Sequence, residues 1–71
     1  MLLNNIELDV KTKCIEQKLS QQQVGEDVGT NGPYVSRLIN HPEIIVNKTF
    51  LAVMERLGYD VRLVYELRKE S

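Results

Sequence analysis

The chain has little with which to build a covalently or metal-stabilised fold. It contains one cysteine, Cys14, one histidine, His41, and no tryptophan. One cysteine cannot form an internal disulfide bond, and one cysteine with one histidine is too few ligands for a closed zinc site. No apolar run approaches the roughly 20 residues that a membrane-spanning helix needs. The first residues also lack the basic start and apolar stretch of a signal peptide, so we expect a cytoplasmic protein.

The composition is that of one small folded domain. The 71 residues are 42% hydrophobic and 27% charged, as in globular rather than disordered chains. A chain of this length buries only about 60% of the surface that it exposes when unfolded, so its core is thin. Because we expect neither disulfides nor a metal site, self-association is the remaining common way to stabilise it.

The first of four stretches with helical patterns covers residues 5–18. Apolar residues recur there at every fourth position, which predicts a buried stripe that includes the lone cysteine: Ile6, Val10 and Cys14. Leu8 and Ile15 lie on nearly the opposite face. They are either two isolated exposed residues, which is normal, or a contact with a partner chain or with the C-terminal tail.

Two further helices separated by a tight turn are predicted next. Ser20 is a good N-cap, and Gln23 three residues later completes a capping box. Gly29 is expected to end this helix in a left-handed conformation. Asn31 then caps the second helix of the pair, which runs to residue 39 before an Asn-His-Pro sequence that stops it.

The fourth helix is predicted at 48–57, after a loop over residues 41–47 whose apolar side chains fold back on the core: Ile44, Ile45 and Val46. Asn47 caps this helix and Gly58 ends it. Four apolar residues form one face: Phe50, Val53, Met54 and Leu57.

From Asp60 the apolar period changes from near 3.6 residues to 2, which predicts an amphipathic strand over residues 60–67. The alternating residues are Val61, Leu63, Tyr65 and Leu67. A lone strand leaves its backbone groups unpaired, so we expect these residues to form a dimer with the same strand of a second molecule. A helix from Glu66 onward is the alternative. We therefore divide the chain into a domain at 1–58 and a tail at 59–71.

Two short helices joined by a glycine turn are the physical content of a helix-turn-helix. Gly25 would let the two helices of residues 20–40 approach closely, while apolar residues face inward: Val24, Val28, Val35 and Leu38. Five residues are then expected to face outward on the second helix: Asn31, Gly32, Pro33, Ser36 and Arg37. Such a helix would enter the DNA major groove with its N-terminal residues first. The predicted fold is therefore all-α, with four to five short helices, a helix-turn-helix and a C-terminal strand.

The stretch from Leu19 to Asn40 resembles the Xre (lambda-repressor-like) family of helix-turn-helix regulators. It follows the pattern Leu-Ser-Gln-x-x-Leu-Ala-x-x-Leu-Gly-Val-Ser-x-x-Tyr-Ile-Ser-Arg-Ile-x-Asn without a gap. Downstream, Asn47-Lys-Thr-Phe and Leu57-Gly-Tyr-Asp are similar to short regulators of this type from phages and integrative elements. The resemblance implies a double-stranded DNA partner, a homodimer, and a transcriptional repressor or autoregulator.

The resemblance also implies contacts for individual residues. Gln21 matches a residue that touches the DNA backbone and braces the recognition helix, and we expect Gln22 beside it to contact the DNA backbone as well. Asn40 matches a phosphate-contacting residue, and Lys48 lies near a loop along the adjacent backbone. Each glutamine also has the plainer role of a good helix former.

Several positions depart from the family pattern. Gly25 replaces the usual alanine and Thr30 an apolar residue, while Gly32-Pro33 brings no polar side chain where base-reading residues stand. Arg37 remains as the obvious bidentate reader of guanine, unless it is a solvated surface charge. Specificity would then depend on Asn31, Ser36 and DNA shape. Tyr34 is either a core residue or a hydroxyl beside phosphate.

The charge balance weakens this interpretation without excluding it. Nine basic and ten acidic residues give a net charge of −1, so we expect weak nonspecific DNA binding. Five basic residues could share one face: Lys11, Lys13, Lys18, Arg37 and Lys48. The alternative function is a protein-binding module, such as a toxin-neutralising antitoxin, and a third is an architectural factor that bends DNA. Because the sequence has no paired-carboxylate, nucleophile–base or phosphate-loop motif, we expect no enzyme activity, small-molecule substrate or cofactor.

Overall fold

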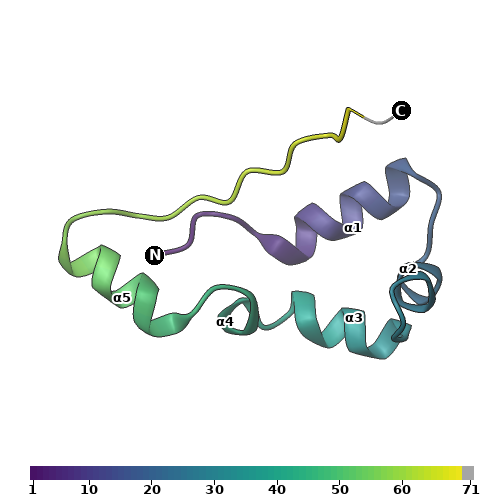
Figure 1. Cartoon of the computed structure of the whole chain (residues 1–71), viewed down its shortest axis with the longest axis horizontal. Helices are drawn as coiled ribbons and strands as arrows, with labels where there is room; N and C mark the ends of the chain where they lie inside the picture. The colour runs from purple at the N-terminus through teal and green to yellow at the C-terminus, as the bar shows by residue number, and fades with distance from the viewer. Residues whose placement is uncertain (70–71) are drawn as a thin grey trace.

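The computed structural model describes residues 1–69, and these form five helices between extended N- and C-terminal segments (Figure 1). The helices are α1 (Ile6–Glu16), α2 (Gln21–Asp27), α3 (Gly32–Ile39), α4 (Pro42–Ile45) and α5 (Lys48–Arg56). Helices α3, α4 and α5 follow one long edge of the molecule, and α1 follows the other with the tail beside it. The mostly helical class is as predicted. The last two residues of the predicted tail, 70–71, lie outside the described residues.

The predicted helix boundaries are set by local side-chain bonds. Ser20 Oγ accepts from the Gln23 amide at 3.0 Å, and Asn31 Oδ1 accepts from the Tyr34 amide at 2.8 Å. Asn47 Oδ1 accepts from the amides of residues 49 and 50. The glycines after α2 and α5, at positions 29 and 58, have φ angles of 87° and 94°, so both occupy the left-handed region that ends a helix.

The predicted loop at 41–47 is wrong in part, because Pro42–Ile45 form the one-turn helix α4. A proline fits the first turn of a helix, where its missing amide hydrogen is not needed. The Val46 amide donates to the Pro42 carbonyl at 2.8 Å and closes this turn. Ile44 and Ile45 are exposed rather than folded back on the core, and only Val46 of that trio is half-buried.

The core is small and lies where α1, α3 and the two end segments meet. Three apolar side chains are buried, Ile6, Val35 and Ile39. Three half-buried residues pack against them: Leu2, Val10 and Leu63. The N-terminal segment and the tail thus complete a core that the helices alone leave open.

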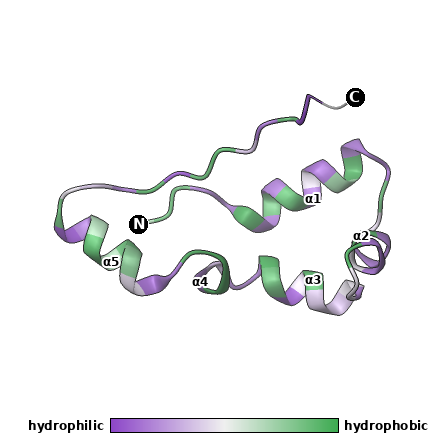
Figure 2. Ribbon diagram, in the orientation of Figure 1, coloured by the Kyte–Doolittle hydropathy of each residue, from purple (hydrophilic) through white to green (hydrophobic). Residues whose placement is uncertain are grey.

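Other residues that were expected in the core lie outside it. Val28 was predicted to face inward, but its side chain is 70% exposed. It is the C-cap of α2, so the chain has already left the helical path there. The predicted apolar face of α5 also remains exposed at Phe50, Val53 and Leu57. Figure 2 shows apolar residues over the middle of α5, at the end of the molecule away from α2.

Residues 60–67 are extended, but the predicted regular strand is not confirmed. A single parallel bridge joins Val61 to Leu2. The Leu3 amide donates to the Val61 carbonyl and the Val61 amide to the Met1 carbonyl, each at 2.8 Å. At Leu63 the backbone groups bond to the Asn4 side chain instead of to backbone, so the ladder does not continue. Up to residue 69 the tail also forms no helix.

Within residues 1–69, no helix combines the length and the hydrophobicity that a membrane crossing requires.

Candidate nucleic-acid interface

Helices α2 and α3 are held unusually close by a glycine. A Cβ atom built on Gly25 would lie 2.5 Å from both the carbonyl carbon and the oxygen of Asn31. Those are backbone atoms, so they could not move aside without shifting the start of α3. In Figure 1, α2 is seen almost end-on while α3 lies across the view, so the two helices cross steeply. The close approach predicted for Gly25 therefore occurs at the turn between the helices.

Gln22 braces the first turn of α3. Its Oε1 accepts from the Gly32 amide at 2.9 Å, and its Nε2 donates to Glu26 at 2.7 Å. A Cβ on Gly32 would lie 2.7 Å from Gln22 Oε1. The outward orientation predicted for Gly32 is therefore wrong, because this residue is buried beneath the Gln22 side chain.

The bracing role implied for Gln21 is thus carried by its neighbour. Gln21 is half-buried at the start of α2. Sequence alone offers one indication of this switch, namely a glycine at the first helical position of α3. Without a side chain there, the amide is open to the glutamine at the second position of α2, Gln22.

The outer face of α3 is polar and accessible. Pro33, Arg37 and Asn40 are exposed and Ser36 is half-buried, at spacings of three and four residues. The buried residues Val35 and Ile39 occupy the opposite side. Asn31 is exposed too, but its Oδ1 is engaged in the N-cap bond. Pro33, Ser36 and Arg37 of the predicted groove-facing residues therefore lie together along one accessible edge, whereas Asn31 is exposed at the N-cap, four residues before the buried Val35.

Arg37 is positioned by an aromatic neighbour on its own helix. Its guanidinium carbon lies 5.4 Å from the centre of the Tyr34 ring, within the range of a cation–π contact. Tyr34 is exposed, so the core role considered for it is not observed. The ring limits the directions that the guanidinium can sample while leaving its N–H groups open to a partner.

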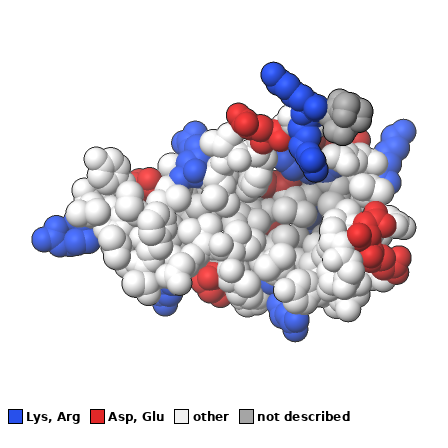
Figure 3. All heavy atoms as spheres, viewed as in Figure 1, with Lys and Arg blue, Asp and Glu red and all other residues white. Residues whose placement is uncertain are grey.

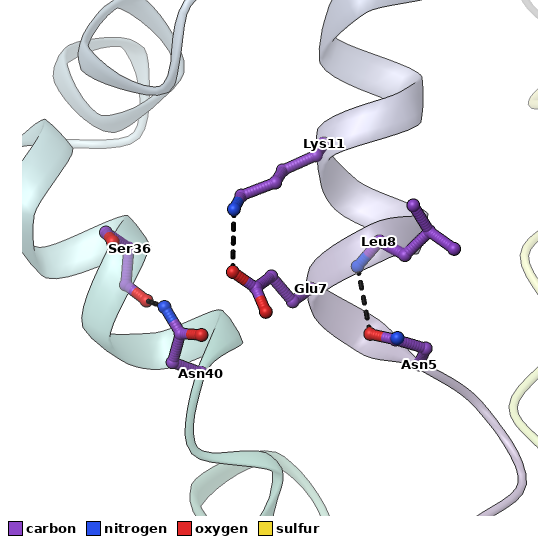
Figure 4. Close-up of polar contacts among 6 residues, drawn as sticks. All are labelled: Asn5, Glu7, Leu8, Lys11, Ser36 and Asn40. Carbon is purple, nitrogen blue, oxygen red and sulfur yellow. Dashed lines mark hydrogen bonds and ion pairs between the residues drawn. The ribbon is translucent and has the colours of Figure 1, made fainter.

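The end of α3 faces an ion pair on α1. Asn40 Nδ2 donates to the Ser36 carbonyl at 2.8 Å, and Lys11 Nζ lies 2.6 Å from Glu7 Oε2. Figure 4 shows the Glu7–Lys11 pair between the two helices, with the Asn40 side chain folded back on α3. Glu7 therefore offsets the charge of Lys11 beside this part of the site.

The basic residues that could share one face are dispersed. Lys13 Nζ lies 4.8 Å from the centre of the Tyr65 ring, so it contacts the tail. Lys48 is exposed at the start of α5. Figure 3 shows separate basic groups along the edge formed by α3, α4 and α5, with an acidic group between them. The accessible face of α3 therefore has only a weak positive field around it.

Three of the four predicted dimerisation residues contact their own chain. Val61 bonds to the N-terminal segment, Leu63 to Asn4, and the Tyr65 hydroxyl donates to Asp9 Oδ2 at 2.9 Å. Partial burial and the bond to Asp9 raise the pKa of Tyr65. Leu67 is 91% exposed. The tail is thus held to the N-terminal segment by backbone groups of Val61 and Leu63, and to α1 by the Tyr65 side chain.

The remaining predicted features contribute no further site. Cys14 is half-buried, and among residues 1–69 no group of three or more histidine, cysteine or acidic side chains could hold a metal ion. Comparison with known proteins finds no matching protein family, no matching curated protein and no matching solved structure.

Proposed function

We propose that this protein is a homodimeric, double-stranded-DNA-binding transcriptional regulator of the Xre helix-turn-helix type, acting as a repressor or autoregulator. The observation that carries the proposal is the α2–α3 pair, in which Gly25 and Gln22 hold α3 tightly while Arg37 and its polar neighbours stay exposed. A recognition helix that enters the DNA major groove needs this combination of a fixed backbone and an accessible outer face.

In the proposed complex, α3 lies in the major groove and each polar residue has a separate task. Arg37 presents a guanidinium fork to the O6 and N7 atoms of guanine. Asn31 uses Oδ1 for its cap, which leaves its Nδ2 group free to donate to a base edge. Asn40 donates one Nδ2 hydrogen to Ser36 and keeps the other for a phosphate.

Electrostatic attraction contributes little in this proposal, so base contacts must contribute much. Arg37 and Lys48 would supply two phosphate- or groove-facing cations per protomer. Four such cations in a dimer give an expected slope of about −4 for log affinity against log salt concentration. A strongly basic regulator would have a steeper slope and higher affinity for unrelated DNA.

The test is to select bound sites from random duplex DNA and to measure affinity for the enriched site. We expect an inverted repeat, and Arg37→Ala should weaken binding of the dimer about 30-fold or more, because one bidentate base contact of about 1–3 kcal/mol is lost in each half-site. Arg56→Ala is the matched control, since it removes an exposed arginine from the far end of α5. Equal loss from both variants would contradict the assignment of Arg37.

A protein-binding module, such as a toxin-neutralising antitoxin, is the second candidate. It is favoured by Leu8 and Ile15, which are 58% and 77% exposed on the outer side of α1. If no duplex is bound or enriched at about 50 mM salt, where phosphate contacts are strong, this second function replaces the first.

A further inference from the structure

The extended tail has one edge whose backbone groups are satisfied within the chain. The Val61 amide and carbonyl bond to Met1 and Leu3. The next residue on that edge, Leu63, donates to Asn4 Oδ1 at 2.6 Å and accepts from Asn4 Nδ2 at 3.0 Å. The Asn4 side chain thus continues, for one residue, the pairing that the N-terminal backbone begins.

The opposite edge of the tail is open. Successive residues of an extended strand direct their amide groups to alternate edges, so Arg62, Val64 and Glu66 face away from the N-terminal segment. Throughout residues 1–69, no hydrogen bond involves the backbone groups of these three residues, and all three are exposed. An open edge of this kind is a template for another strand.

We infer that this edge pairs antiparallel with the same edge of a second copy of the chain, with the two-fold axis at Val64. The inference deepens the proposed function, because it specifies how the proposed homodimer forms. The resulting sheet would run from the N-terminal segment through the two tails to the partner's N-terminal segment.

The charges of the tail are self-complementary in this register. Arg62 lies opposite Glu66 of the partner subunit, and Val64 lies opposite its own copy. Asp60 lies opposite Arg68 of the partner subunit, although Asp60 already accepts from the Met1 amino group at 3.0 Å. The Arg62–Glu66 pair, which occurs twice in the dimer, therefore determines the register more strongly than the Asp60–Arg68 pair.

Neighbouring registers are disfavoured by charge. Moving the centre by one or two residues in either direction places like charges opposite each other, which is destabilising. With the axis at residue 62 or 66, Arg62 or Glu66 lies opposite its own copy. With the axis at residue 63, Asp60 lies opposite Glu66, and with the axis at residue 65, Arg62 lies opposite Arg68. Among these five registers, only the one centred on Val64 has no such conflict.

The other face of the paired tails is apolar in the same register. Leu63 lies opposite Tyr65 of the partner subunit, and Val61 lies opposite Leu67 of the partner subunit. Leu67, which is 91% exposed in the single chain, would gain an apolar neighbour. The side chains predicted to form the dimer thus become cross-strand pairs, while Tyr65 keeps its bond to Asp9 on α1.

The surface of the single chain is larger than that of a compact monomer, as expected if a second copy covers part of it. A folded monomer of 8.2 kDa exposes about 4,500 Å², whereas this chain exposes 5874 Å². The excess is about 1,300 Å² per protomer, which matches obligate homodimers that bury about 2,000–5,000 Å² in total. The radius of gyration, 14.1 Å, likewise exceeds the ~11 Å of a compact chain of this length.

Disulfide trapping tests the register directly. In a Cys14→Ala background, Val64→Cys should cross-link to itself on mild oxidation, because facing Cα atoms at the axis lie about 5.5 Å apart. Arg62→Cys alone should not, since its two copies would be about 14 Å apart. Arg62→Cys mixed with Glu66→Cys should give the mixed dimer. Self-cross-linking of Arg62→Cys or Glu66→Cys without that of Val64→Cys would overturn the inference.

Sedimentation without DNA tests the charge pairing. Arg62→Glu and Glu66→Arg should each weaken dimerisation tenfold or more, because two attractive pairs become repulsive, and the double variant should return to within about threefold of wild type. A wild-type chain that stays monomeric, or single variants that dimerise as well as the wild type, would overturn the inference. A dimer that binds no DNA would contradict only the proposed function, whereas monomers that bind DNA would contradict only the pairing.

Discussion

Replacing Gly25 with alanine sets helix propensity against packing. In an exposed helix interior, alanine is favoured over glycine by about 1 kcal/mol. Here the new Cβ would meet the carbonyl carbon and oxygen of Asn31 at 2.5 Å and its Cα at 2.9 Å. Overpacking of this kind costs about 1–3 kcal/mol, and displacement of the Asn31 cap costs about 1 kcal/mol more. We therefore expect Gly25→Ala to lower the free energy of unfolding by about 1–3 kcal/mol, contrary to its effect on propensity.

Urea unfolding followed by far-ultraviolet circular dichroism measures this change. Protein concentration must be fixed, because dimerisation would contribute to the apparent stability. Thr12→Ala is the matched control, since it adds an alanine to an exposed position inside α1 whose side chain makes no hydrogen bond within residues 1–69, and it should change stability by less than about 0.5 kcal/mol. If Gly25→Ala is as stable as wild type and binds DNA equally well, the close approach of α2 and α3 is refuted.

Three smaller predictions concern single contacts. Asn47→Ala removes the α5 cap and should cost about 1 kcal/mol in urea unfolding; an unchanged midpoint would show that the cap is not needed. Gln22→Ala removes the bond to the Gly32 amide and should cost about 0.5–1.5 kcal/mol while weakening DNA binding, so full stability would contradict the brace. Because burial and the bond to Asp9 raise the pKa of Tyr65, its contact stabilises the fold below about pH 10 and is lost as pH rises through the raised pKa. The tyrosinate absorbance of the wild type should include this raised titration, and that of Tyr65→Phe should lack it. Two titration curves that differ only in amplitude and not in shape would refute the prediction.

The helix boundaries could be predicted because they depend on contacts across three or four residues. Ser20, Asn31 and Asn47 each bond to an amide two or three positions ahead, and such patterns are visible in sequence. The glycines that end α2 and α5 follow the same local logic. The apolar stripe of α1 was predicted from periodicity, although only Ile6 of its three residues is buried, while Val10 and Cys14 are half-buried.

What sequence reasoning missed depends on contacts between elements. The bond from Gly32 to Gln22 spans ten residues, and its partner is fixed by how the helices cross rather than by any periodic pattern. Val28 leaves the core because α2 ends one residue before it. In the tail, the period of 2 correctly indicated an extended chain. The pairing of Leu63 with Asn4 could not be predicted, because the N-terminal segment that contains Asn4 has no periodic pattern.

One helix connects the thin core to the proposed DNA contact. Val35 and Ile39 of α3 are buried against Ile6, and Leu63 of the tail packs against the same cluster. Arg37 lies on the opposite face of that helix, so its position is fixed by contacts that run through α1 to the tail. In the proposed dimer, the separation of the two α3 helices would therefore be set by tail pairing. It follows that a tail variant could leave each half-site contact unchanged while altering the spacing between half-sites that the protein recognises.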